Sequence, residues 1–582
     1  MKTYSKIIAA VLCTLGVVSL QAQNQDEYNE NVTINVSFDP MVTDANKINQ
    51  NPSIFDTSFT NVDMSFERLL RKYDTNLSFD TIKAAQVKGE PVAQLYKLHL
   101  KGGLGWAYGG KELSNGFVPL LQASYTSLRD RKLLYGVDVY SRSALAGAKE
   151  FGHNSFSNSD INLWGKRIFN SYALTSQIFY NYSRNYWYGS KELSMDEYDK
   201  KDYRIAWNNI GFNLGYNKLE RDESFQHKAF FEFDYSSTKQ NRRELDLHFT
   251  LDAYKNLNLI SKASNQILGL SFDYKHAFSS LTHLDSTYNR ALFNIAPYLI
   301  FDYNKFHFFA SLAIIPGINT YQSLQILPTA TISFELIQQL LSFYGGIKSE
   351  SKMPMLKELT RHNPYLSPSA EIFDESYTNI FAKAFLAISP KFSVSLEGGY
   401  TSLRNTLFYQ STYCRTAIDS TFANTCAQNP YNQFQTLYTN GNKLYATLET
   451  SFTIANSFRA EISATYQNIT REDDFQAWYC PNFMAKAKMS YTWDKLNIML
   501  TPAFYSRMSA AYFKEDTNNQ TYTIKEVKLR PIIDLNLSAS YNYTDQWSFF
   551  LNLENLAFQQ YRLLYNYPVY EFTIIAGVGY KF

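Results

Sequence analysis

Eight histidines are the residues of this chain best suited to bind a metal or transfer a proton, and their spacing argues against both roles. They are His99, His153, His227, His248, His276, His283, His307 and His362. None forms the i, i+4 pair that two metal ligands on one helix face require. His283-Leu284-Asp285-Ser286 comes nearest to a nucleophile set, but a catalytic triad is assembled from distant segments. With no P-loop, nucleophile elbow or Cys-x-x-Cys, we expect no catalytic site, no enzyme activity and no cofactor.

A glycine run and two acidic loops are the next groups that could bind a ligand. Gly102-Gly103-Leu104-Gly105 lacks the helix that follows a phosphate loop and lies in an alternating strand pattern, so we expect close backbone packing at a barrel seam. The oxygen ligands in or beside these acidic loops are Asn468, Glu472, Asp473, Asp474, Glu515 and Asp516. Their oxygens suit calcium, but solvated acidic loops are more common, so we expect no metal site.

Tyr186, Trp187 and Tyr188 form an aromatic run beside a long polar segment. Rings at a loop mouth can stack on a glycan or a peptide, whereas rings at a membrane interface form a girdle. We favour the outer girdle.

Three cysteines lie outside the N-terminal apolar run. Cys414 and Cys426 flank an eleven-residue polar segment, so their pairing would close a surface loop in an oxidising compartment. Two free thiols are the alternative. Cys480 is left over, in a second loop.

The last fifteen residues predict the kind of element that carries these groups. Aromatic and aliphatic residues occupy alternate positions there, with mostly small or polar residues between them. An antiparallel strand with one face in lipid and the other in a polar lumen has this pattern. It resembles the C-terminal sorting strand of Gram-negative outer-membrane barrels, for which the partners are membrane lipid and the barrel assembly machinery. The sorting-strand residues are Tyr570, Phe572, Ile574, Val578, Tyr580 and Phe582.

The same alternation recurs in other parts of the chain, for example from Leu268 to Phe278 and from Ile533 to Tyr543. The chain contains 45 Tyr and 43 Phe and its mean hydropathy is negative. A barrel has both properties, because half of its strand residues face water and its aromatic residues form two girdles. The net charge of +2 gives no reason to expect a nucleic-acid partner.

Short and long connections broadly alternate along the chain, as periplasmic turns and outer loops do in a barrel. Short turns are expected near residues 170–172, 255–257, 304–305, 389–391, 456–458 and 544–546. Long loops are expected near residues 144–159, 190–202, 351–375, 405–440, 472–482 and 508–524. Counting strands between them predicts an all-β transmembrane antiparallel barrel of about 22 strands over residues 96–582.

The N-terminal residues predict export and a short leader. Lys2 and Lys6 precede an apolar run that ends before Ala22, which indicates a cleaved signal peptide over residues 1–22. Residues 23–95 do not fit the barrel pattern, and we interpret them as a partly ordered periplasmic leader. Its strand-like residues Val32, Ile34, Val36 and Phe38 could dock a partner by strand pairing.

Several residue runs resemble one family of outer-membrane barrels. They are Phe38-Asp39-Pro40, Asp44 to Asn49, Ile82 to Pro91, Leu95 to Lys97, Lys101 to Gly105, Leu163 to Lys166, Asn185 to Gly189 and Asn363-Pro364-Tyr365. They are similar to the outer-membrane barrels labelled TonB-dependent receptor or receptor-like. True TonB-dependent receptors carry a globular plug ahead of the barrel, and residues 23–95 are too few for one. A TonB box could lie within Asn31 to Val36.

Two functions follow from this pattern. The resemblance implies solute uptake or transport across the outer membrane of a Gram-negative cell, for a solute that the residues do not name. The alternative is a non-catalytic subunit of an outer-membrane complex that docks a periplasmic or surface protein through its leader and loops. Without a plug, the lumen of such a barrel must be filled by loops, by the leader or by bulky inward side chains such as Phe230, Phe309 and Phe550.

Overall fold

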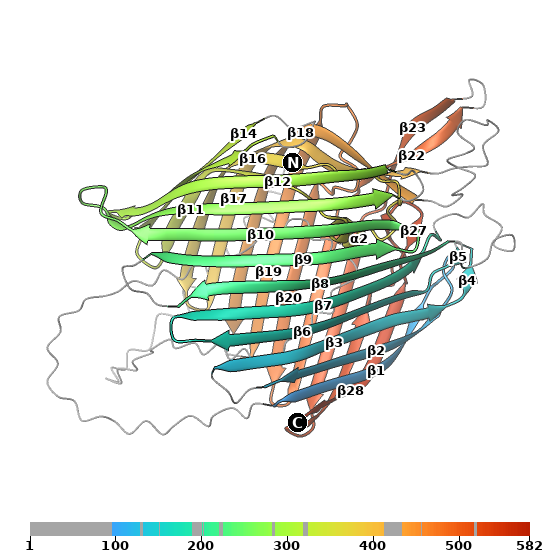
Figure 1. Ribbon diagram of the computed structural model, residues 1–582. Coiled ribbons are helices and arrows are strands. Elements are labelled where there is room, and N and C mark those ends of the chain that lie inside the picture. Colours follow the sequence, from blue (N-terminus) through green and yellow to red (C-terminus); the bar gives the residue numbers. More distant parts are fainter. Residues whose placement is uncertain are drawn as a thin grey trace, which may run out of the picture. The chain divides into compact units, whose positions relative to one another are not determined.

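The computed structural model describes residues 96–582, except 128–131, 151, 189–200, 202, 220–224, 282–285, 318–323, 413–432, 455–456 and 517–520. These residues form an all-β barrel with one short helix (Figure 1). Within them, no helix is long and apolar enough to cross a membrane. The predicted signal peptide and the predicted leader lie outside the described residues.

The main sheet has 24 strands, of which β22 (Ser509–Asp516) and β23 (Thr521–Lys528) form a hairpin beyond the wall, so 22 strands build the barrel. The wall strands are β1 (Leu98–Tyr108), β2 (Gly116–Thr126), β3 (Leu133–Ala146), β6 (Phe156–Ile168), β7 (Tyr172–Tyr186), β8 (Arg204–Lys218), β9 (Gln226–Thr238), β10 (Arg242–Asn256), β11 (Ser264–Leu281), β12 (Ser286–Tyr303), β13 (Phe306–Ile315), β14 (Gln325–Ile337), β15 (Leu341–Lys352), β16 (Glu375–Ser389), β17 (Phe392–Thr412), β18 (Gln433–Ile454), β19 (Phe458–Arg471), β20 (Phe483–Trp493), β21 (Leu496–Tyr505), β24 (Ile532–Asn542), β25 (Trp547–Glu554) and β28 (Phe572–Lys581). The predicted strand number is therefore confirmed.

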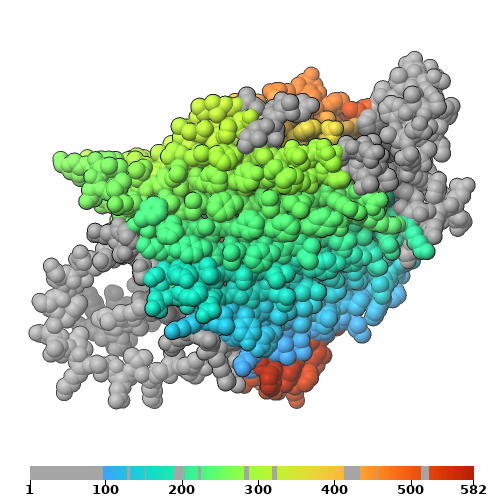
Figure 2. All heavy atoms as spheres, in the orientation of Figure 1, coloured from blue at the N-terminus to red at the C-terminus, as the bar shows by residue number. Residues whose placement is uncertain are grey.

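Each wall strand pairs antiparallel with the next, and the last strand closes the barrel on the first. In that seam, His99 lies opposite Lys581 and Tyr108 lies opposite Phe572. Figure 2 shows successive strands as adjacent bands, with the last strand in red against the first in blue. Closure removes both sheet edges, so every strand has a neighbour on each side.

The outward face of the wall is apolar, as the alternation predicts. Leu268, Leu270 and Phe278 on β11 are exposed, as are Ile533 and Tyr541 on β24. The residues between them point inward and are largely polar, which is the arrangement of a barrel whose outer face contacts lipid. The outer-membrane location expected from the sequence agrees with this wall.

The connections divide between the two ends of the barrel as expected. The predicted short turns at residues 304–305 and 389–391 join β12 to β13 and β16 to β17 at the end where the chain enters β1. The predicted loop at residues 472–482 and the helix α2 (Leu356–His362) lie at the opposite end (Figure 1). Three hairpins lie there too: β4 (Ala148–Lys149) paired with β5 (Gly152–His153), β22 paired with β23, and β26 (Arg562–Leu564) paired with β27 (Tyr567–Pro568). We call this the outer end.

Two predicted loops are wrong in extent. The loop expected over residues 405–440 is shorter, because β17 continues to Thr412 and β18 begins at Gln433. The loop expected over residues 508–524 contains the hairpin of β22 and β23. In both places strands continue past the membrane, where both faces can be polar and the alternation that marks a wall strand disappears.

Candidate functional site

The connection between β15 and β16 folds into the barrel, and we call it the lumen loop (Met353–Asp374). At its start, Met353 and Met355 are buried against an apolar patch on the inner wall. The patch consists of Ala277, Leu292, Ile315 and Leu327. From there the loop continues along the inner wall as α2, so an outer connection occupies part of the lumen.

Helix α2 is held against β10 by its first residue. Leu356 and Leu359 are buried, while the early Glu358 and the late Arg361 complement the helix dipole. The backbone N–H of Leu356 has no acceptor within the helix and donates to the Glu244 carboxylate at 2.5 Å. The Glu244 carboxylate of the wall therefore caps this N–H group, in the place that a side chain of the loop itself would otherwise take.

Lys357 joins α2 to β9. Its ammonium group forms ion pairs with both Glu232 and Asp234 and lies 5.9 Å from the ring centroid of Phe179 on β7. Burial lowers the pKa of Lys357, but the two carboxylates raise it more, so its pKa lies above the ordinary value. The lysine remains charged and ties the loop to the wall.

Two arginines of the wall bind the backbone of the lumen loop. Arg242 is fully buried and donates through Nη1 to the carbonyls of Pro368 at 2.9 Å and Ala370 at 2.7 Å. Arg290 donates to the carbonyl of Pro354 at 2.8 Å. These hydrogen bonds from charged donors hold the two arms of the loop.

The return arm of the loop reaches β18 on the other side. Leu366 and Phe434 form a parallel β-bridge, and the backbone N–H of Ser367 donates to the Phe434 carbonyl at 2.8 Å. The indole N–H of Trp207 on β8 donates to the Pro364 carbonyl at 3.4 Å. The lumen loop is thus anchored on strands from β8 to β12 and on β18, and it bridges the lumen.

A cluster of buried apolar residues, which we call the mouth core, covers the lumen loop at the outer end. It draws on the loops that follow β7, β19, β21 and β25 and on the ends of β17 and β18. Its members are Tyr186, Trp187, Tyr203, Ile205, Trp207, Leu356, Leu359, Leu366, Ala370, Ile372, Phe408, Tyr409, Phe434, Trp478, Tyr479, Met508, Ala510, Ala511, Leu529, Ile532, Tyr561, Tyr567 and Val569. This packing joins the loops that contribute to it into one body at the outer end.

The aromatic run belongs to this mouth core, so its assignment to an outer girdle was wrong. Tyr186 and Trp187 are each 3% exposed. Tyr188 donates to the Pro568 carbonyl at 3.1 Å, and the Tyr365 and Tyr567 rings stack beside it at 3.7 Å. Girdle residues and buried loop residues are both aromatic, and only the fold distinguishes them.

His362, at the end of α2, makes the lumen loop sensitive to pH. Its Nδ1 lies 3.1 Å from the Tyr409 hydroxyl, and burial lowers its pKa below the ordinary 6.5. A histidine with a lowered folded-state pKa favours the packed loop above its ordinary pKa and opposes it as the pH falls. Below pH about 6.5 we therefore expect an increase in the hydrogen exchange of residues 353–374, once the rates are corrected for the pH dependence of intrinsic amide exchange. His362→Gln should remove this increase, and the same pH response in both proteins would contradict the assignment.

Strand β28 carries most of the predicted sorting residues. Phe572, Ile574, Val578 and Tyr580 alternate on its outward face, and Phe582 follows the strand with its backbone hydrogen-bonded to Leu98. Tyr570 precedes the strand, and its hydroxyl donates to the Asn154 carbonyl at 3.1 Å. Tyr570 is therefore a loop residue, while the sorting role of the others stays a prediction.

A thiol count tests the predicted disulfide, whose residues Cys414 and Cys426 lie outside the described part of the chain. Burial raises the pKa of Cys480 to about 11, despite Lys443 and Arg471 nearby. This thiol should therefore react slowly with a maleimide at neutral pH. In denaturant without reductant, we expect about one reactive thiol per mature chain. About three thiols would mean that the bridge does not form.

The other groups singled out in the sequence have structural roles where they are described. Across the described segments, no three His, Cys, Asp or Glu residues are placed to hold a metal ion. Asp473 pairs with Arg471, whose guanidinium lies 4.1 Å from the Trp478 ring centroid. Gly103 faces Gly577 across the seam, which confirms the predicted close backbone packing. The docking residues of the leader, Val32, Ile34, Val36 and Phe38, are outside the described residues.

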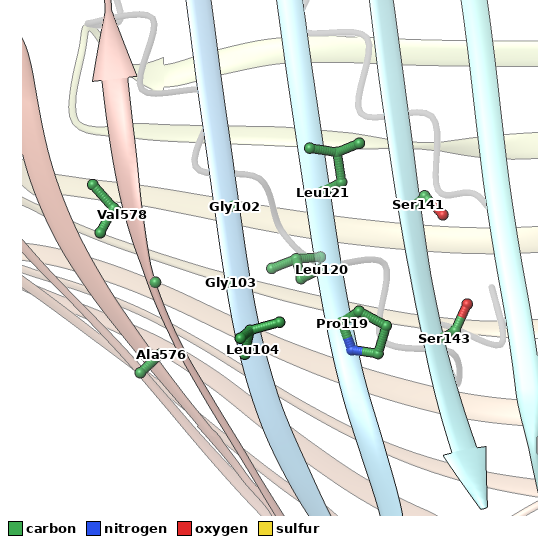
Figure 3. Close-up of a pocket in the computed structure, with 11 residues that line it drawn as sticks. Gly102, Gly103, Leu104, Pro119, Leu120, Leu121, Ser141, Ser143, Ala576 and Val578 are labelled. Carbon is green, nitrogen blue, oxygen red and sulfur yellow. The ribbon is translucent and has the colours of Figure 1, made fainter.

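A shallow groove of about 570 Å³ crosses β28, β1, β2 and β3 (Figure 3). Leu104, Leu121 and Val578 at its rim are 63%, 50% and 38% exposed, so it opens on the outward face. Acyl chains cover that face in a membrane. The groove belongs to the lipid-facing surface and lies off the path through the lumen.

The charged residues that hold the lumen loop were not predicted from the sequence. Glu232 with Asp234 and Glu244 with Asp246 stand at alternate positions on β9 and β10, a spacing that places each pair on one strand face. That spacing was a usable signal for a charged patch in the lumen. Lys357 had no comparable signal, because a lysine in a polar loop is ordinary.

Comparison with known proteins identifies the fold. No protein-family model matches this chain, and no curated protein does. Solved structures do match. A mutant of the ferric enterobactin receptor PfeA from Pseudomonas aeruginosa has a TM-score of 0.60 at 10% identity, over 84% of this chain and 81% of that chain. The siderophore receptor PirA from Acinetobacter baumannii has a TM-score of 0.61 at 12% identity, with 84% and 81% covered.

The FrpB iron transporter from Neisseria meningitidis is equally similar, with a TM-score of 0.60 at 10% identity over 84% of this chain and 82% of that chain. All three are named as receptors or transporters. At these identities the match concerns the fold. The described chain has the barrel fold of siderophore receptors and iron transporters, in agreement with its resemblance to TonB-dependent receptors.

Proposed function

We propose that this barrel takes up a solute across the outer membrane and that the lumen loop is its movable barrier. One observation carries the proposal. The loop that occupies the lumen is attached to the wall mainly through side chains, chiefly Lys357, Arg242 and Arg290, and through one short β-bridge to Phe434. The wall itself is held by continuous strand ladders. Side-chain anchors can break without disturbing the ladders, so the loop can move while the barrel stays closed.

Two further observations support the same proposal. Barrels of 16 to 18 strands already enclose an aqueous channel, so 22 strands leave room for a solute once the loop moves. The similar structures are named as receptors for siderophores and as an iron transporter.

A disulfide across the Leu366–Phe434 bridge tests whether loop movement is needed for uptake. Leu366→Cys with Phe434→Cys would be made in a chain whose other cysteines are replaced, since residues paired in a β-bridge are close enough to cross-link. Cells carrying the parent barrel should deplete at least one solute from a defined medium faster than cells without it. Oxidised cells with the cross-link should lose this difference and recover it on reduction. Equal depletion in all strains would overturn uptake.

The alternative is a barrel subunit of a larger complex, and the hairpin of β22 and β23 favours it. This hairpin extends beyond the wall at the outer end (Figure 1), where a surface protein could bind. The leader with Val32, Ile34, Val36 and Phe38 offers a second docking element. A tag on an outer loop and gentle solubilisation test this alternative. A stoichiometric partner that is lost on removing residues 23–95 would support it, and a bare barrel would not.

A further inference from the structure

Four carboxylates face one region of the lumen, on the inward faces of β9 and β10. They are Glu232, Asp234, Glu244 and Asp246. Asp246 lies directly opposite Asp234 in the antiparallel register, and each of these two residues is 1% exposed. Like charges in opposite positions repel, and a buried charge is costly without a counter-charge. In its fully ionised form, this acidic patch therefore needs cations.

Three of the four carboxylates have partners of opposite charge or good donors. Lys357 pairs with Glu232 and Asp234. Arg290 lies 3.5 Å from Glu244, which also accepts the N–H of Leu356. Arg242, the other nearby cation, donates instead to loop carbonyls and to a tyrosine hydroxyl.

Asp246 is the exception. Neither of its carboxylate oxygens has a hydrogen-bond partner among the described residues. A buried carboxylate that lacks donors is strongly disfavoured in its ionised form unless a ligand supplies them; otherwise it takes up a proton. Lys357 pairs with Asp234 but not with Asp246, so the acceptors of Asp246 are open to a further donor of a cation bound beside Asp234.

We propose that Asp234, Asp246 and Glu232 bind the primary ammonium group of a solute, and that Lys357 occupies this site when the solute is absent. The lysine side chain demonstrates that an alkylammonium group fits. An ammonium has three donors, which suits several carboxylate acceptors, and the Phe179 ring presents a face for a cation–π contact. The solute class is therefore an amine-bearing cation.

Binding at this site also moves the barrier. Lys357 belongs to α2, so a solute that takes its place on Glu232 and Asp234 removes the anchor of the helix on β9. A ligand shifts an equilibrium by its differential affinity for the two states. Lys357 leaves the carboxylates only when the loop is released, so the amine binds the released state. Its binding therefore stabilises the released loop. This inference rests on the proposed uptake function.

Binding of cadaverine to the full-length barrel in nanodiscs tests the site, with calorimetry at low salt as the readout. Lys357→Met removes the internal competitor, so cadaverine should bind at least about tenfold more tightly than to the parent protein. Adding Asp246→Asn to this variant should reverse the gain by about tenfold or more. Asp246→Asn preserves the side-chain shape and removes only the charge. The heat-dependent gel mobility of each variant shows whether its barrel is folded.

Lys383→Met is the matched control. Lys383 also lies between two carboxylates, Glu397 and Glu449, but all three residues belong to the wall and none touches the lumen loop. We expect its cadaverine affinity to equal that of the parent. Equal affinities in Lys357→Met and Lys383→Met, or equal binding of the uncharged 1,5-pentanediol, would overturn the site. Cadaverine binding without any solute uptake in the cross-linking experiment would overturn transport and leave the site standing.

Discussion

Removal of the lumen loop is expected to turn a partly filled barrel into a wide open pore. Replacing residues 354–372 by a short Gly-Ser linker deletes α2 and both arms that cross the lumen. Conductance through single barrels in a planar bilayer should rise by about tenfold or more, because a barrel of this strand number has a wide polar lumen once it is emptied. The wall should persist, because its ladders do not include the loop.

Shortening the hairpin of β22 and β23 by residues 514–523 is the control for this deletion. It removes chain at the same end, and the register of Phe513 with Ile524 lets the hairpin close again. The control should conduct like the parent barrel. Unchanged conductance after removal of the lumen loop would mean that this loop is not the barrier.

Replacement of Gly577 by alanine is expected to open the seam between β28 and β1. A Cβ at this position would lie 2.2 Å from the backbone carbonyl oxygen of Gly102 and 2.5 Å from Cζ of Phe550. The ring could shift, but the carbonyl belongs to the strand ladder and cannot. Overpacking of this kind costs about 1–3 kcal/mol. We expect Gly577→Ala to lower the free energy of unfolding by an amount near the upper end of this range.

Gly102→Ala gives the matched comparison, since an added Cβ there meets no atom within 4 Å. Both substitutions add one methyl group within the same seam, one facing inward and one facing lipid. Unfolding in urea, followed by the gel mobility of the folded barrel, should distinguish them clearly. Equal stability of the two variants would contradict the close approach of β1 and β28.

The wall of this protein was largely predictable because its information is local. Alternation in Leu268 to Phe278 and in Ile533 to Tyr543 depends only on which residues face lipid and which face water, and strand geometry repeats every two residues. Short turns such as Asn304 with Lys305 are likewise marked by their own residues. Strand number, wall polarity and seam glycines followed from these signals.

Predictions became unreliable where the chain leaves the membrane. Tyr186 and Trp187 have the composition of girdle residues, yet they are buried in the mouth core with residues from eight other segments of the chain. Tyr570 continues the alternation of β28 but precedes it. Lipid contacts the outer face of a strand only within the bilayer. Beyond it, apolar and polar residues need not alternate, so alternation in the sequence no longer predicts which residues face outward.

The sequence by itself determined the barrel and left its contents open. It marked residues 351–375 as a long polar connection, but not that this connection enters the lumen. Tertiary structure decided that, because Lys357 meets Glu232 and Asp234 across separations of 125 and 123 residues. A charge in a loop looks the same in the sequence whether water or a buried carboxylate solvates it. Only the closed wall, which places these strands around one lumen, turns that lysine into an anchor.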